Sequence, residues 1–288
     1  MSDKKVWFIT GSSTGFGREL AEEALAQGHK VVATARKPET LEDLVSKYPE
    51  AARAVRLDVT DRDEVGKAID EAVRAFGRVD VVVNNAGYGL MGALEEPTDE
   101  QIRQQFETNL FGAINVMRGA LPQLRRQGGG HVLNVSSVGG FIAFPATGYY
   151  TASKFALEAL SEALAGEAAQ HGVKVTVVEP GAFRTDFNGR SLHLPETRMA
   201  AEYPATDEFV NWLQEMDGKQ PGDPRKAAQA MIKVVESEHP PLRLPLGEDA
   251  VTAIEAELEA VKQDIAPWRA TAVDTAFAGA TFGAIGGK

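Results

Sequence analysis

The chain has 288 residues, of which 43% are hydrophobic, and a formal net charge of −11. This length suits one well-buried α/β domain, which we expect to span residues 1–288, and the acidic balance disfavours nucleic acid as a partner. The absence of cysteine excludes disulfides, thiolate nucleophiles and Cys-ligated metals, and without a dense His/Asp cluster no metal site is expected.

Short β-branched runs alternate with longer amphipathic stretches along the chain. The predicted strands are Val6–Thr10, Val31–Ala35, Ala54–Asp58, Val79–Asn84, His131–Ser136 and Val173–Glu179. The predicted helices lie near Gly17–Gln27, Glu39–Lys47, Asp61–Phe76, Asp99–Gln127 and Tyr150–His171. Apolar strands that alternate with helices indicate parallel connections and a sheet buried on both faces. We therefore expect an α/β fold, a Rossmann-like doubly wound parallel sheet of about seven strands with helices on both faces.

Other local signals refine this outline. Residues 98–101 (Thr-Asp-Glu-Gln) predict a capping box at the start of the fourth helix, and Pro122 is expected to kink or end its regular part. Residues 186–223 are irregular, which is typical of a substrate lid. A last strand over Leu242–Leu246 and a helix over Asp249–Ile265 begin a C-terminal extension, residues 248–288.

Targeting and membrane signals are weak. The first apolar run, Val6–Ile9, is too short for a signal-peptide core, and no segment is long and apolar enough to span a bilayer. The Gly/Ala-rich tail Thr275–Gly287 is interpreted as a loose or surface-docked terminus. We expect a cytoplasmic protein that has no membrane partner.

A glycine-rich loop follows the first strand, with the sequence Thr-Gly-Ser-Ser-Thr-Gly-Phe-Gly over residues 10–17. Gly11 permits a tight turn, Gly15 lets the backbone approach a pyrophosphate, and Gly17 lets the next helix pack closely on the strand. That helix would direct its unpaired N–H groups at the phosphates. A purely structural turn is the alternative, because the spacing G-x-x-x-G-x-G differs from the usual G-x-G-x-x-G.

The end of the second strand bears on the choice of cofactor. Enzymes that prefer NAD usually place an acid there, whereas this strand ends with Ala35, Arg36 and Lys37. Arg36 can bind a 2′-phosphate with a charge-assisted contact, so we expect NADP(H) to be preferred, with NAD(H) possible. The alternative is a solvated basic pair, which is supported by the lack of a basic residue at positions 12–14 of the glycine loop.

A serine, a tyrosine and a lysine form a second constellation. Ser136 and Ser137 end the fifth strand, and Tyr150 and Lys154 lie one turn apart on the next helix. A nearby ammonium favours the phenolate and would move the phenol pKa from about 10 toward neutrality. Such a group is suited to general acid/base catalysis at an alcohol or carbonyl oxygen. A Tyr–Lys pair that merely stabilises a helix is the alternative.

These motifs together resemble the classical short-chain dehydrogenase/reductases, over roughly Lys5–Thr185. The matches also include Asp58-Val59, Asn84-Asn85-Ala86-Gly87, Asn109, Pro180-Gly181 and Thr185. The chain departs from the commonest members by ending roughly forty residues later, after Leu246, and it most resembles a 17β-hydroxysteroid dehydrogenase-like bacterial branch. This label does not establish a steroid substrate.

The resemblance implies a role for each matched residue. Tyr150 would be the general acid/base, Ser137 rather than Ser136 the catalytic serine, Lys154 the ligand of the nicotinamide ribose, and Asn109 the holder of a relay water. The remaining matches would bind the cofactor: Gly11, Ser13, Thr14, Gly15, Phe16, Gly17, Arg36, Lys37, Asp58, Val59, Asn85, Ala86, Gly87, Tyr150, Lys154, Pro180, Gly181 and Thr185. For Asn109, Asp58 and Thr185, a helix kink, a helix cap and an ordinary turn are the structural alternatives.

The substrate is a small molecule that the sequence does not name. The expected pocket walls are aromatic and favour a hydrophobic carbonyl compound, although half of them could be core: Phe141, Phe144, Tyr149, Phe183, Phe187 and Trp212. The resemblance and the apolar helices near residues 99–127 and 150–171 indicate a homo-oligomer, with a dimer favoured.

A catalytically silent NADP-binding regulator is the alternative function, and the intact Asn109, Ser137, Tyr150 and Lys154 argue against it. A sugar-nucleotide epimerase would need a larger substrate domain, and a metal-dependent dehydrogenase is disfavoured because the chain has no cysteine and no dense His/Asp cluster.

Overall fold

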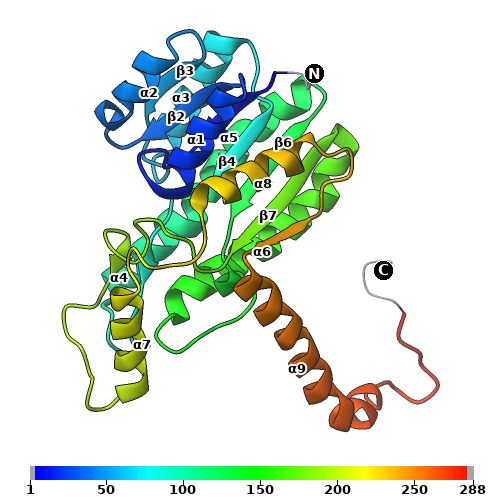
Figure 1. Ribbon diagram of the computed structural model, residues 1–288. Coiled ribbons are helices and arrows are strands. Elements are labelled where there is room, and N and C mark those ends of the chain that lie inside the picture. Colours follow the sequence, from blue (N-terminus) through cyan, green and yellow to red (C-terminus); the bar gives the residue numbers. More distant parts are fainter. Residues whose placement is uncertain (1–3, 284–288) are drawn as a thin grey trace.

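Seven parallel strands form the main sheet of the computed structural model, which describes residues 4–283 (Figure 1). Their order is β3-β2-β1-β4-β6-β7-β9. Their bounds are β1 Val6–Ile9, β2 Lys30–Ala35, β3 Ala52–Arg56, β4 Val81–Asn84, β6 Gly130–Val135, β7 Val173–Pro180 and β9 Arg243–Leu246. Two short strands, β5 (Gly89–Leu90) and β8 (Leu192–His193), pair separately in parallel. The predicted doubly wound parallel sheet is confirmed.

Helices cover both faces of the sheet. Their bounds are α1 Gly15–Ala26, α2 Glu42–Lys47, α3 Arg62–Phe76, α4 Asp99–Phe106, α5 Gly112–Arg126, α6 Gly148–Ala168, α7 Pro204–Glu215, α8 Pro224–Glu236 and α9 Glu248–Val273. Side chains alternate between the faces along each strand. Trp7 and Ile9 therefore pack in the core under α1, α2 and α8, whereas Phe8 packs in the core under α3, α5 and α6.

The fourth predicted helix, Asp99–Gln127, is present but is not regular. A π-helical turn over Glu107–Phe111 separates α4 from α5. The capping box is confirmed, because the Thr98 hydroxyl accepts from the Gln101 N–H and the Gln101 side chain accepts from the Thr98 N–H. The helix does not end at Pro122 but continues to Arg126. The irregularity lies at Asn109 instead.

Two helices were absent from the sequence prediction. Helix α7 lies within residues 186–223, which were expected to be irregular, and α8 follows it directly. The start of α8 could have been predicted from the sequence, because Asp223 is an N-cap residue that accepts from the N–H of Arg225 and Pro224 lies in the first turn. Helix α9 begins near the expected residue but runs to Val273 rather than Ile265.

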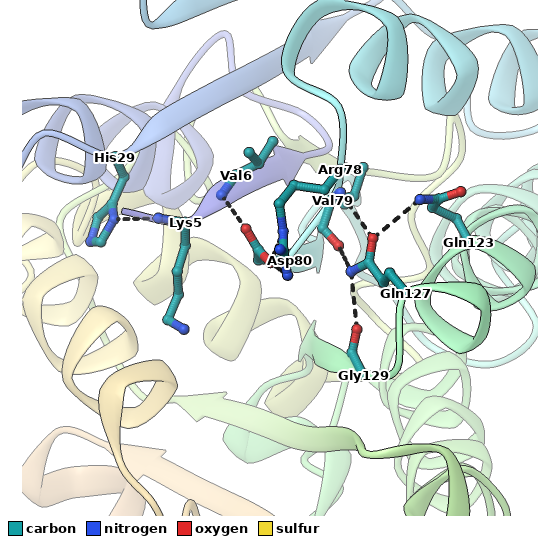
Figure 2. Close-up of polar contacts among 9 residues, drawn as sticks. All are labelled: Lys5, Val6, His29, Arg78, Val79, Asp80, Gln123, Gln127 and Gly129. Carbon is teal, nitrogen blue, oxygen red and sulfur yellow. Dashed lines mark hydrogen bonds and ion pairs between the residues drawn. The ribbon is translucent and has the colours of Figure 1, made fainter. Parts of the chain in front are cut away.

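The amino ends of the central strands are closed by polar side chains (Figure 2). The Asp80 carboxylate accepts from the Val6 N–H at 2.8 Å and from Arg78 Nε at 2.7 Å. The Gln127 amide donates to the carbonyl oxygens of Val79 and Gly129. These contacts join β1, the turn before β4 and the turn before β6. The opposite, carboxyl edge of the sheet is left for ligands.

Within residues 4–283, none of the helices has the length and apolar character that crossing a bilayer requires. The part of the Gly/Ala-rich tail that is described, residues 275–283, is exposed, and residues 284–287 of that tail lie outside the described chain.

Candidate active site

The glycine loop connects β1 to α1 at the carboxyl edge of the sheet. Gly11 and Gly15 both have positive φ, at 66° and 56°, which favours glycine. A Cβ on Gly17 would lie 2.4 Å from the Gly11 carbonyl oxygen, so only glycine allows α1 to start this close to the strand. Thr14 is the N-cap residue, but its side chain makes no capping hydrogen bond. The first N–H groups of α1 thus suit a phosphate, and the loop fits a dinucleotide.

The segment after β4 is tied to the glycine loop through Thr10. The Thr10 hydroxyl donates to the Val83 carbonyl oxygen and accepts from the N–H groups of Asn85 and Ala86, at 2.9 and 3.0 Å. The Asn85 amide returns to the loop by donating to the carbonyl oxygens of Thr10 and Gly11. A Cβ on Gly11 would lie 3.0 Å from the Cα of Ala86. Two of the predicted cofactor segments therefore form one unit.

The predicted adenosine-side residues lie at the ends of β2 and β3. Ala35 is buried, whereas Arg36 and Lys37 are exposed at the same sheet edge as the glycine loop. Asp58 does not cap the next helix, because it accepts from the N–H and hydroxyl of Thr60, and Asp61 is the N-cap. Val59 is buried against Gly112 of α5.

Tyr150, Lys154 and Ser137 lie together beside the end of β6. Lys154 Nζ donates to the Val135 carbonyl oxygen at 2.8 Å and lies 5.8 Å from the centre of the Tyr150 ring. Burial raises the pKa of Tyr150 to about 12, and a hydrogen bond with Ser137 acts in the opposite direction. Burial also lowers the pKa of Lys154 to about 8. The pKa of the phenol is therefore not shifted toward neutrality as the sequence predicted, because desolvation penalises the phenolate.

Asn109 lies in the π-helical turn and hydrogen-bonds to the backbone of the segment after β4. Its amide donates to the Tyr88 carbonyl oxygen at 2.9 Å, and its Oδ1 accepts from the Tyr88 N–H at 3.0 Å. A Cβ on Gly87 would lie 3.1 Å from this Oδ1 and 3.7 Å from Lys154 Nζ. Asn109, Gly87 and Lys154 are therefore neighbours. π-Helical turns are frequently found at functional sites.

Gln105 is a supporting residue that the sequence analysis missed. It is fully buried, its Oε1 accepts from the Leu90 N–H at 2.7 Å, and its Nε2 donates to the Tyr88 carbonyl oxygen. Its position one turn before Asn109 on an amphipathic helix carries no signal that distinguishes it from a surface glutamine.

The six aromatic residues predicted to line the pocket divide into groups. Phe187 lies 5.4 Å from Tyr150 between ring centres, and Phe144 and Trp212 both contact Phe209 of α7. Tyr149 donates its hydroxyl to the Leu94 carbonyl oxygen.

The other two aromatic residues lie elsewhere. Phe183 packs on Phe16 and the core under α1, and Phe141 lies beneath the Arg243 guanidinium. Apolar residues that were not predicted complete the cluster at Tyr150: Met91, Ala146, Leu192, Leu194, Phe209, Val210 and Leu213. Several of these belong to residues 186–223.

The loop after β7 approaches the glycine loop. A Cβ on Gly15 would lie 3.6 Å from the Thr185 side chain, so these two residues face each other. The Gly181 N–H donates to the Leu246 carbonyl oxygen, and the Ala182 N–H donates to the Asp249 carboxylate at 2.7 Å. The loop that begins at Pro180 is thus held from the C-terminal side by β9 and α9.

A buried acidic pair lies next to the catalytic candidates and was also missed. Glu158 and Glu179 are both almost fully buried, and both bind the Arg243 guanidinium. Glu158 follows Lys154 by one helical turn, and its charge raises the pKa of Lys154 against the effect of burial. Burial raises the pKa of both carboxyl groups. The sequence offered no signal for this cluster, because Arg243 is distant along the chain.

Comparison with known proteins identifies the class that the sequence motifs resemble, the short-chain dehydrogenase/reductases. The short chain dehydrogenase family model matches residues 5–193. Oxidoreductase BOA17 of Botryotinia fuckeliana is 42% identical over 267 residues, which cover 92% of this chain and 97% of the relative. A 3-ketodihydrosphingosine reductase of Bacteroides thetaiotaomicron is 38% identical, covering 84% of this chain and 88% of the relative.

Solved structures agree in fold. A short-chain dehydrogenase from Streptomyces avermitilis has a TM-score of 0.87 and 43% identity, covering 96% of this chain and all of that one. A short-chain dehydrogenase/reductase from Burkholderia phymatum in complex with NAD has a TM-score of 0.78 at 25% identity, covering 91% and 95%. An alcohol dehydrogenase from Thermococcus sibiricus with 5-hydroxy-NADP has a TM-score of 0.69 at 27% identity, covering 85% and 96%.

The parallel sheet, the glycine loop at its carboxyl edge and the adjacent Ser–Tyr–Lys group define an NAD(P)-dependent oxidoreductase that acts on alcohol or carbonyl groups. The chain belongs to the short-chain dehydrogenase/reductase family.

Replacing Glu158 by Gln tests the electrostatic link to Lys154. Removing the carboxylate removes a charge that raises the pKa of Lys154, so the ammonium loses its proton at lower pH. Glu158 carries its charge only above its own raised pKa, so the change in the Lys154 pKa is expected on the alkaline side of the pH profile. We expect the alkaline limb of kcat/KM against pH to move to lower pH by on the order of one pH unit.

Glu162→Gln is the matched control. Glu162 lies one turn further along α6 and also binds Arg243, with an Nη2–Oε2 distance of 3.1 Å, but its side chain is 45% exposed. Its replacement should leave the alkaline limb in place. An equal shift in both variants would show that the loss of an Arg243 partner, rather than proximity to Lys154, is responsible.

Proposed function

We propose that this enzyme interconverts a carbonyl and a secondary alcohol on a hydrophobic small molecule, with NADP(H) as the preferred cofactor and Tyr150 as the general acid/base. The observation that carries the proposal is the position of the Tyr150 phenol. It lies in an apolar cluster, hydrogen-bonded to Ser137, with the Lys154 ammonium on the same helix face.

The residues around Tyr150 suit proton transfer at a substrate oxygen. With a pKa raised by burial to about 12, the phenol keeps its proton at neutral pH and can donate it to a developing alkoxide. In this proposal Ser137, which hydrogen-bonds to the phenol, would hold the same oxygen. Lys154, which lies near Gly87, would return a proton to the phenolate. The nicotinamide cofactor, when bound, supplies or accepts the hydride.

The proposal of a hydrophobic substrate rests on the side chains around Tyr150. Met91, Phe187, Leu192 and Val210 are apolar and pack at this site. The Bacteroides relative is named as a reductase of a keto compound, which favours a ketone substrate here as well. The 17β-hydroxysteroid dehydrogenase-like branch that the sequence motifs suggested also stays a proposal.

The preference for NADP(H) rests on the end of β2. Because residue 35 is alanine, no carboxylate at this position repels a 2′-phosphate, and the next residue, Arg36, is exposed. Arg36 can make a charge-assisted contact with that phosphate, which NAD lacks.

We also propose a homodimer through α5 and α6, as the family resemblance implies. Phe111 at the start of α5 and Phe155 and Leu160 on α6 are large, apolar and exposed, which is typical of a surface that another subunit covers. Light scattering at micromolar concentration should give at least twice the monomer mass of 30.9 kDa. A monomer mass would contradict this proposal.

Replacing Tyr150 by Phe tests the proposed acid. The ring and its packing on Phe187 remain, but the proton donor is lost, so turnover should fall by at least about a hundredfold. Cofactor affinity should change little. Steady-state kinetics on a ketone panel and a cofactor titration measure the two effects.

Tyr149→Phe is the control, since it removes the neighbouring hydroxyl, which donates to the Leu94 carbonyl oxygen. This variant should keep most of the turnover. Near-normal turnover in Tyr150→Phe, with chemistry rate-limiting, would refute the mechanism.

Replacing Arg36 by Ala tests the cofactor assignment. A hydrogen bond to a charged group contributes about 1.5–3 kcal/mol, so kcat/KM for NADPH should fall roughly ten- to a hundredfold. The value for NADH, measured on the same variant, should change far less. A wild type that prefers NADH, or equal losses with both cofactors, would overturn the preference for NADP(H).

A further inference from the structure

Helix α9 projects from the body of the molecule (Figure 1). Only its first turns are anchored, through buried Ala250 and Ile254 and through the Asp249 carboxylate. From Leu258 to Val273 every residue of the helix is exposed. This part of α9 gains no stability from packing on its own chain, although most helical stability in proteins comes from packing an apolar face.

A continuous apolar stripe runs along α9 from its anchored first turns, which include the buried Ile254, into the exposed part from Leu258 onward. Its large apolar residues are spaced alternately by three and four positions: Val251, Ile254, Leu258, Val261, Ile265 and Trp268. Such spacing is the a/d pattern of a coiled-coil seam, in which Val251, Leu258 and Ile265 occupy a positions. Pro267 lies at a c position, so its ring is not part of the apolar seam.

The charges that flank the stripe match a parallel partner of the same sequence. Glu257 and Asp264 occupy g positions, and Lys262 and Arg269 occupy the e positions five residues later. In a parallel pair each g residue lies beside the following e residue of the other helix, so every such contact here joins opposite charges. An antiparallel pair that matches Leu258 with Val261 would instead place Glu257 beside Asp264 of the other copy.

We propose that α9 is a docking surface for a second copy of this chain, and that the two α9 helices form a parallel, in-register coiled coil over residues 258–272, beyond the anchored first turns. The proposal rests on the helix itself and not on the proposed reaction. It adds an interface to the one proposed for α5 and α6.

The composition of α9 does not favour a membrane as the partner. Helices that lie on anionic membranes are rich in Lys and Arg on their polar face. In α9 the acidic residues outnumber the basic ones, Lys262 and Arg269. An anionic surface would repel this helix, whereas a second α9 presents both signs of charge at the matching positions.

A single introduced cysteine tests both the contact and its orientation, because the chain contains no cysteine. In the parallel pair Ile265 faces Ile265 of the other copy, whereas in an antiparallel pair that matches Leu258 with Val261 the two Ile265 side chains lie far apart. Ile265→Cys should form a disulfide-linked dimer under mild oxidation. Gln263→Cys, on the opposite side of α9, is the control and should crosslink much less. Equal crosslinking in the two variants would overturn the proposal.

The mass in solution provides an independent measurement. The double variant Leu258→Glu with Ile265→Glu places charges in the seam and should halve the mass measured by light scattering at micromolar concentration. With no α5/α6 interface the wild-type dimer becomes a monomer, and in a closed tetramer built from both interfaces the seam variant leaves the α5/α6 dimer. The double variant Ala256→Glu with Gln263→Glu adds the same charge away from the seam and should keep the wild-type mass. A seam variant that retains the wild-type mass would also overturn the proposal.

Discussion

The hydroxyl of Thr10 makes the contact on which the arrangement of the site depends. It joins the end of β1 to the end of β4 by donating to the Val83 carbonyl oxygen and accepting from two successive N–H groups, those of Asn85 and Ala86. Because both strands are parallel neighbours, this contact sets the glycine loop and the segment after β4 at one sheet edge. That segment continues to Gly87, which lies against Lys154, so the phosphate end and the reacting end of the site share one fixed support.

Burial shapes the electrostatics of the site more strongly than the proximity of opposite charges. Desolvation raises the pKa of Tyr150 and lowers that of Lys154, which keeps the phenol protonated and makes the ammonium easier to deprotonate. Glu158 opposes the second effect, but it is itself buried and requires the Arg243 guanidinium from β9. Charged groups inside a protein are stable only with such partners. The last strand of the sheet therefore contributes to the environment of a lysine on a distant helix.

Much of the fold was readable from local patterns, because β-branched runs between amphipathic stretches identify buried parallel strands directly. The sequence also located Tyr150 and Lys154, which the structure brings together with Ser137. What could not be read depends on tertiary partners. Phe183 lies in the loop after β7, and the sequence shows that this loop residue is aromatic but not which neighbour it packs on, so it was expected in the pocket although it packs on Phe16. The pKa of Tyr150 was expected to fall because the ammonium was visible in the sequence and the extent of burial was not.

The π-helical turn at Glu107–Phe111 has a consequence for how this chain can evolve. Such a turn corresponds to one extra residue within an α-helix, and α-helical hydrogen bonding is more favourable than π-helical. Deleting one residue there would let α4 and α5 join as a regular helix with little change in their relative rotation, because a π-helical turn absorbs the extra residue, but it would displace Asn109 relative to Gln105. Gln105 and Asn109 could then no longer both hold the backbone of Tyr88. Insertions and deletions in this short stretch should therefore be rejected by selection, even when they make the helix itself more stable.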